Sequence, residues 1–162
     1  MTAIENMKYI MQRLAPNSTF GGPFFKRLNL IQDYVNEDPR LISLINQKHE
    51  VLFRMSVSDE FCNALNTMHG GAISTLIDIT TTIAISGFDK NLRQNVSAEL
   101  STYYLNPIKI NSQILIHVKV PKIGKTLAYS HADIYEDENL KLCVNGSHIK
   151  AMLDKTWRED KI

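Results

Sequence analysis

The stretch that decides the fold runs from Asn63 to Asp78 and reads Asn-Ala-Leu-Asn-Thr-Met-His-Gly-Gly-Ala-Ile-Ser-Thr-Leu-Ile-Asp. A loop here delivers His69 and the pair Gly70-Gly71 to the start of an apolar segment. Residues at helical spacing then follow, and they are Ala72, Ile73, Leu76, Ile77, Thr80, Ile83 and Ala84. Gly87 is expected to close this helix as its C-cap. The pattern predicts one helix of about four turns, whose β-branched residues require burial on nearly all sides.

Strands are expected on both sides of this helix. Before it, residues 28–35 and 49–57 read as strands, the second because apolar and polar residues alternate. After it, four strands joined by short turns are expected, at residues 96–104, 112–122, 126–135 and 140–153. Short turns between strands predict an antiparallel meander. A sheet that wraps one apolar helix forms a single core, so the expected fold class is α+β.

The N-terminal part of the chain reads differently. Residues 4–14 predict a short amphipathic helix, and residues 16–23 predict a hinge rich in Pro and Gly. We therefore expect an N-terminal helical arm at 1–25, a main domain at 26–155 and a C-terminal tail at 156–162.

The overall composition excludes several classes of partner. The chain has 18 Lys+Arg against 17 Asp+Glu, which is too little basic excess for nucleic-acid binding. No apolar run reaches the roughly 18 residues of a membrane span. The two cysteines, Cys62 and Cys143, are too few for a disulfide framework and suggest an intracellular protein. A cytoplasmic location is expected, and the basic residues near the N-terminus keep a mitochondrial one open.

Charge is missing from the central segment. The 28 residues from 61 to 88 have Asp78 as their only formal charge. On an apolar helix this carboxyl group would lose solvation, and its pKa would rise toward that of a general base. Alternatively, Asp78 is held by a neighbouring hydroxyl group or pairs with a lysine from a strand. The absence of other charges favours the catalytic interpretation.

The start of the helix is a second candidate site. Its first N–H groups have no partner within the helix, and glycine lets a ligand approach them, which suits an oxyanion hole. His69 has either a structural or a catalytic role there. A Cys62–His69 nucleophilic pair is disfavoured because nothing marks Cys62 as acidified. No metal-ligand spacing or phosphate-binding loop is present, so neither a metal nor a cofactor is expected.

Together these residues resemble the hotdog-fold acyl-CoA thioesterases, in the PaaI-like branch of the 4-hydroxybenzoyl-CoA thioesterase superfamily and its thioesterase superfamily member 2 type. The resemblance covers roughly residues 50–153. It rests on Asn63, His69-Gly70-Gly71, Asp78, Val96-Ser97-Ala98-Glu99-Leu100, Asn106-Pro107 and Gly124-Lys125-Thr126-Leu127-Ala128-Tyr129.

The resemblance implies a long central helix wrapped by a curved antiparallel sheet, and hydrolysis of fatty acyl-CoA, with medium to long chains favoured. The Gly70 N–H would polarise the thioester carbonyl, helped by Asn63. Asp78 from a partner subunit would activate or align a water that Ser97 helps to position, and His69 would support the loop or form a hydrogen bond near the thioester. The family also implies a dimer or a dimer of dimers with shared active sites.

The phosphates of CoA require positively charged partners, and the candidates are Lys125 and Arg93, with Gly71 at the helix start. Two other functions remain open. One is a non-catalytic acyl-CoA-binding hotdog module. The other is an enoyl-thioester hydratase or dehydratase, whose Asp-x4-His and Pro-Gly-x4-Glu patterns are absent here.

Overall fold

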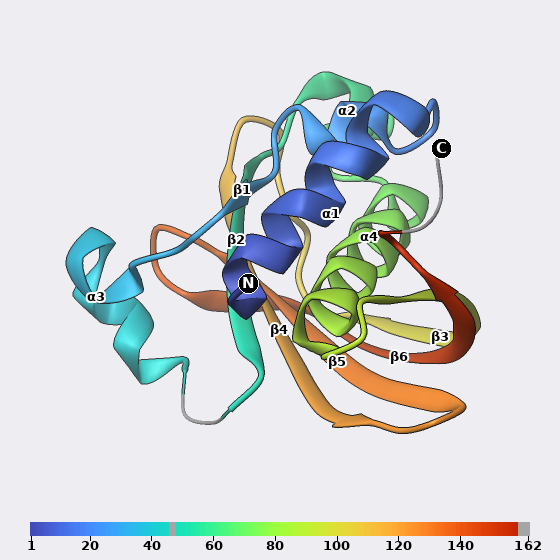
Figure 1. Cartoon of the computed structure of the whole chain (residues 1–162). Helices are drawn as coiled ribbons and strands as arrows, with labels where there is room; N and C mark the ends of the chain where they lie inside the picture. The colour runs from blue at the N-terminus through green and yellow to red at the C-terminus, as the bar shows by residue number, and fades with distance from the viewer. Residues whose placement is uncertain (46–47, 159–162) are drawn as a thin grey trace.

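The computed structural model describes residues 1–45 and 48–158, and it confirms the α+β hotdog fold (Figure 1). A curved, six-stranded antiparallel sheet wraps the long central helix α4. The helices are α1 (Ala3–Asn17), α2 (Gly22–Phe25), α3 (Tyr34–Glu37), η1 (Pro39–Ser43), η2 (Asp59–Phe61) and α4 (Gly70–Phe88). The strands are β1 (Asn29–Leu30), β2 (Glu50–Ser56), β3 (Arg93–Tyr104), β4 (Gln113–Ile123), β5 (Leu127–Glu136) and β6 (Lys141–Thr156).

The order of the strands is β1-β2-β4-β5-β6-β3. The expected meander is therefore correct for β4, β5 and β6, but β3 pairs with β6 and not with β4. The reason is the helix between β2 and β3. A helix of 19 residues is about 28 Å long, and α4 carries the chain across the concave face of the sheet to its opposite edge. This crossing places β3 beside β6, where the two strands can contribute to one site.

The strand expected at 28–35 is wrong beyond its first residues. Only Asn29 and Leu30 pair with β2. Asp33 then caps a short helix, because its side chain accepts a hydrogen bond from the Asn36 N–H. The chain then continues through the end of α3 into η1. An aspartate N-cap thus overrides the apolar pattern that suggested a strand.

The main core lies between the concave face of the sheet and helices α1 and α4. Figure 1 shows α1 lying alongside α4, and Met7 and Ile10 of α1 are fully buried in this core. Trp157, which follows β6, is buried there as well. The predicted arm (1–25) and the predicted tail (156–162) thus both contribute to the main core, although residues 159–162 lie outside the described part.

Gly87 does not act as a C-cap. Helix α4 continues to Phe88, and no glycine has a positive φ among the described residues. A Cβ atom at Gly87 would instead lie 2.3 Å from Cγ of Met7. The glycine is therefore needed because α1 and α4 approach each other closely at this point.

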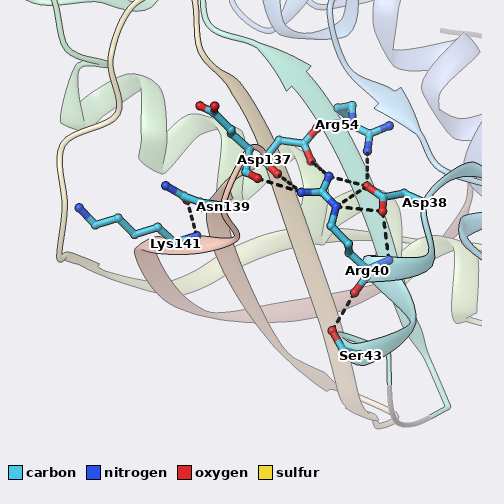
Figure 2. A network of polar contacts seen from close by, with 8 residues as sticks. Asp38, Arg40, Ser43, Arg54, Asp137, Asn139 and Lys141 are labelled. Atoms are coloured by element: carbon cyan, nitrogen blue, oxygen red, sulfur yellow. Dashed lines mark hydrogen bonds and ion pairs between the residues drawn. The ribbon is translucent and has the colours of Figure 1, made fainter.

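A second, smaller cluster covers the convex face of the sheet at β2 and β4. We call Ile31, Leu41, Leu52 and Leu115 the outer cluster; all four are buried. The segment between β1 and β2 covers this cluster, and Arg40 fixes the segment in place. The Arg40 guanidinium lies between Asp38 and the β5–β6 turn (Figure 2). Arg40 donates to the carbonyl oxygens of Asp137 and Glu138, at 3.0 and 2.9 Å. Both faces of this half of the sheet are therefore covered.

Helix α4 is long and apolar enough to cross a membrane by length and composition alone, with a mean hydropathy of 1.3 in an 18-residue window. In the structure, 56% of that window is buried inside the protein. Its apolar residues are accounted for by the main core.

Candidate active site

The first turn of α4 presents a free backbone donor. His69 is the N-cap, and its Nδ1 accepts a hydrogen bond from the Gly71 N–H at 2.9 Å. The Gly70 N–H donates to no atom of the described residues. Tyr104, at the end of β3, donates its hydroxyl to the Gly70 carbonyl at 3.1 Å. The helix start is thus fixed on two sides while the Gly70 N–H stays available to a ligand.

Asn63 shapes the loop that precedes the helix. Its side-chain oxygen accepts hydrogen bonds from the N–H groups of Leu65 and Thr67, at 2.9 and 3.3 Å. Its amide nitrogen donates to Oγ1 of Thr67 at 3.0 Å. In this arrangement Asn63 holds the loop that delivers His69 and Gly70.

Asp78 lies in the middle of α4, with its side chain 44% exposed. Its Oδ1 accepts a hydrogen bond from Lys150 Nζ at 2.6 Å and one from Ser97 Oγ at 3.2 Å. Thr82 Oγ1 donates to the same oxygen at 3.4 Å. The structure therefore brings Asp78 and Ser97 together, as predicted, and adds the strand lysine that was the alternative partner.

The expected rise in the pKa of Asp78 is wrong. Burial is the largest single influence and acts to raise this pKa, but the lowering effects, led by the hydrogen bond and the charge of Lys150, together hold it below its ordinary value. The charge of His148 and the hydrogen bond from Ser97 act in the same direction as Lys150. Asp78 is thus an ionised carboxylate at neutral pH.

His148 lies beneath Asp78 and is fully buried. Burial, followed by the charge of Lys150, lowers its pKa to about 4, so the ring is neutral at pH 7. Its Nδ1 lies 2.7 Å from Oγ1 of Thr81, whose hydroxyl also donates to the Ile77 carbonyl at 2.7 Å. Thr81 thus holds the ring at Nδ1, and Nε2 faces Oδ1 of Asp78 at 3.8 Å.

An apolar pocket of about 530 Å³ opens beside the start of α4. Its lining includes His69, Gly71 and Thr75 at the start of α4. It also includes aromatic and proline side chains in and near α2 and η2, namely Phe20, Pro23, Phe24 and Phe61.

Cys62 also lines this pocket, but it does not form a nucleophilic pair with His69. Burial raises the pKa of the Cys62 thiol, which favours its unreactive protonated form. The Sγ atom donates to the Ser58 carbonyl at 3.5 Å.

The two predicted phosphate ligands differ in their surroundings. Arg93 forms an ion pair with Asp89 at 2.9 Å and donates to the carbonyl oxygens of Gly124 and Lys125, at 3.1 and 2.8 Å. Its guanidinium therefore fixes the β4–β5 turn to the start of β3. The Lys125 side chain is exposed.

Sequence reasoning missed the roles of His148 and Tyr104, and it offered a strand lysine as a partner of Asp78 without identifying Lys150. A signal was present in β6, where alternate residues face α4. His148 and Lys150 occupy inward positions between Gly146 and Met152. Two basic residues on an otherwise buried face require an acidic partner inside the fold. Among residues 1–45 and 48–158, no group of three His, Cys, Asp or Glu side chains is arranged to hold a metal ion.

Comparison with known proteins agrees with this geometry. Residues 65–143 match the Thioesterase superfamily. Acyl-coenzyme A thioesterase 13 of Mus musculus is 33% identical over 118 residues, which are 73% of this chain and 82% of the relative. The protein of that name from Homo sapiens is 35% identical over 101 residues, 62% of this chain and 71% of the relative. The crystal structure of zebrafish thioesterase superfamily member 2 aligns with a TM-score of 0.76 at 27% identity and covers 94% of this chain and 99% of its own. The chain therefore belongs to the thioesterase superfamily and is a thioester hydrolase with the hotdog fold.

Proposed function

We propose that this protein hydrolyses acyl-CoA thioesters to a free acid and CoA, with no metal or other cofactor. The observation that carries the proposal is that α4 presents both a free N–H, at Gly70, and an ionised carboxylate, at Asp78. The relatives named acyl-coenzyme A thioesterase support CoA as the thiol.

The proposed reaction needs only these two groups and water. The Gly70 N–H polarises the thioester carbonyl and stabilises the negative oxygen that forms there. Asp78 orients a water molecule, with Ser97 beside it, and accepts its proton as the water oxygen bonds to the carbonyl carbon. The carbon–sulfur bond then breaks, and the CoA thiolate leaves and takes up a proton.

A single chain cannot bring the two groups to one carbonyl. Gly70 and Asp78 are eight residues apart in α4, which places them about 12 Å apart along the helix axis. The reacting atoms must lie within roughly 3 Å of both groups. We therefore propose a homodimer, as the simplest assembly, in which Gly70 of one copy faces Asp78 of the partner subunit.

Strand β3 supports such an assembly because it is a long edge strand with exposed apolar side chains. In β3, Val96, Tyr103 and Tyr104 are 50%, 64% and 54% exposed, and Leu105 directly after the strand is 54% exposed. An open edge of this kind is ready to pair with a second copy. Two such dimers could associate further, and measurement of the molar mass in solution distinguishes the two states.

The apolar pocket beside Gly71 supports the proposal that the substrate carries a medium- to long-chain acyl group. Its volume of about 530 Å³ lies in the range of ligand-sized cavities. Phe24 and Phe61 form an aromatic wall there, with ring centroids 4.4 Å apart. For the CoA moiety we propose contacts at Gly71 and a phosphate contact at the exposed Lys125, with Arg93 holding the turn that carries this lysine.

Both cysteines are free, which supports an intracellular location, in the cytoplasm or in mitochondria.

Thiol release from a panel of acyl-CoAs, from acetyl to long-chain and aromatic, tests the proposal directly. Asp78→Asn is expected to keep the fold and to lower kcat by roughly 10²–10⁴-fold, the usual contribution of a general base. Asp154→Asn, at an exposed position of β6, is the matched control and should keep full activity.

Unchanged turnover in Asp78→Asn would refute the role of this residue. Binding of acyl-CoA without thiol release by the unmodified protein would favour the binding module. Loss of the double bond of crotonyl-CoA without thiol release would favour the hydratase.

A further inference from the structure

The contacts around Asp78 are strongly asymmetric. All three hydrogen bonds to its carboxylate, from Lys150, Ser97 and Thr82, end on Oδ1. Oδ2 accepts no hydrogen bond from any residue that the structure describes. Since the side chain is 44% exposed while Lys150 beneath it is 3% exposed, one oxygen is anchored in the protein and the other is open.

Lys150 is the centre of this arrangement. Its ammonium group donates to Asp78 Oδ1 at 2.6 Å and also to Ser97 Oγ at 3.1 Å. Because the Ser97 oxygen accepts from Lys150, its own proton is directed to Asp78, at 3.2 Å. One buried cation thus fixes the orientation of both polar side chains.

The backbone explains why these three residues meet. Ser97 and Lys150 are direct partners across β3 and β6, and the register shifts between Ser97 and Glu99. This irregularity leaves Ala98 as an extra residue, a β-bulge. It places Ser97 on the inner face with Lys150 and Glu99 on the outer face with Ile149.

From this geometry we infer that Lys150 is a positioning residue for the proposed hydrolysis: it anchors Oδ1 of Asp78 and the Ser97 hydroxyl, so that Oδ2 faces the attacking water. The inference rests on the proposed function, and it adds a residue that touches neither the substrate nor the water.

The charge of Lys150 gives this role a measurable signature. The titratable groups that act on Asp78 are Lys150 and His148 on β6, and Glu99 on β3 acts in turn on His148. Burial raises the pKa of Asp78 and Lys150 lowers it below the ordinary value, while burial lowers the pKa of Lys150 itself. Removal of the ammonium group takes away the two largest effects that lower this pKa, while the burial that raises it remains; the weaker effects of His148 and Ser97 also remain. The carboxyl group should then hold its proton at higher pH.

The test compares Lys150→Met with the unmodified protein over the range from about pH 4 to about pH 9, following the loss of thioester absorbance. In Lys150→Met, the acid limb of kcat/KM should move up by roughly one to three pH units, the effect of an adjacent cation on an aspartate. At neutral pH, kcat should fall about 10–100-fold with KM nearly unchanged, as expected for a misplaced catalytic group. Lys150→Arg, which keeps the charge, should leave the acid limb near its original position.

The matched control is Lys119→Met, because Lys119 is also a strand lysine in an ion pair, with Asp133 at 3.1 Å. It should leave the acid limb and kcat unchanged. An acid limb that stays in place in a folded Lys150→Met protein would overturn the inference, even if kcat falls. If Lys150→Met does not fold, Lys150→Gln, which keeps a donor without the charge, takes its place.

A second readout separates this inference from the proposed function. Carboxyl ¹³C NMR, assigned with Asp78→Asn, reports the titration of Asp78 without any substrate. A titration midpoint that does not rise in Lys150→Met would refute the inference, whatever the activity. Conversely, a midpoint that rises in a protein without thioesterase activity would refute the proposed function and leave the effect of Lys150 on Asp78 intact.

Discussion

At the scale of single residues, the role of the Gly70 N–H is the hardest part of the proposed function to test. This donor belongs to the backbone, so truncating a side chain does not remove it. Its position offers a clean substitution. Gly70 is the first residue of α4, and His69 before it has φ −64° and ψ 137°. Proline is favoured at the first position of a helix, and it requires an extended residue before it. Gly70→Pro therefore removes the N–H while both backbone conformations are retained.

We expect Gly70→Pro to fold and to lower kcat about 10²–10³-fold, the usual effect of losing one oxyanion donor. Circular dichroism and thiol release measure the two outcomes. Gly70→Ala is the control for added bulk, because a Cβ atom there would lie 3.4 Å from Tyr104, an ordinary contact. If Gly70→Pro and Gly70→Ala have the same residual activity, the N–H has no catalytic part.

The same scale shows where the sequence was sufficient. The isolated charge of Asp78 and the His-Gly-Gly start of the helix were both visible in the sequence; the first lies in the middle of α4 and the second where the preceding loop meets it. The ionisation state of Asp78 was predicted in the wrong direction. It depends on Lys150, which is 72 residues away in the chain, and on a bulge that decides which face Ser97 occupies. Neither can be read from the local pattern of α4.

At the scale of the elements, α4 holds the molecule together because it contacts α1 on one side and the sheet on the other. The contact with α1 is close at Gly87, whose carbonyl accepts a hydrogen bond from the side chain of the buried Asn6 at 3.2 Å. Helix packing of this kind fixes where α4 lies and hence where Gly70 and Asp78 are presented.

The new methyl group of Gly87→Ala would collide with Met7, and overpacking a core usually costs about 1–3 kcal/mol. The helix propensity of alanine offsets roughly 1 kcal/mol of this cost, so the free energy of unfolding is expected to fall by up to about 2 kcal/mol. Urea unfolding measures the difference. Gly22→Ala is the control, since a Cβ atom at Gly22 meets nothing within 4 Å. Equal unfolding midpoints for the two variants would contradict the packing argument.

At the scale of the whole molecule, the proposed dimer predicts that two inactive variants can complement each other, because only a dimer combines groups from two chains. Gly70→Pro and Asp78→Asn are each expected to be inactive. In a mixed dimer, one site would combine the intact Gly70 of the Asp78→Asn chain with the intact Asp78 of the other. Unfolding and refolding an equal mixture should therefore recover roughly a quarter of the normal activity, since half of the dimers are mixed and each has one intact site.

Refolding each variant separately is the control, and neither should regain activity. Recovery that is absent from a mixture with a normal dimer mass would show that Gly70 and Asp78 do not act across an interface.

The overall architecture was largely predictable because the long apolar helix and the later strands have strong periodicity. The path of the chain between these elements was less predictable from the sequence. The position of β3 follows from the length of α4, and the segment between β1 and β2 follows from aspartate caps. Both are decided by connections rather than by the strands themselves.

The outer cluster under this segment has a consequence for how the chain can change over evolutionary time. Leu52 and Leu115 lie on the convex face of the sheet. In a hotdog domain without the segment between β1 and β2, this part of the convex face would be exposed to solvent. A relative that lacked residues 31–45 would expose both positions, and polar side chains could replace the leucines without loss. The segment and its two leucines are therefore expected to be gained and lost together, independently of the active site on the opposite face.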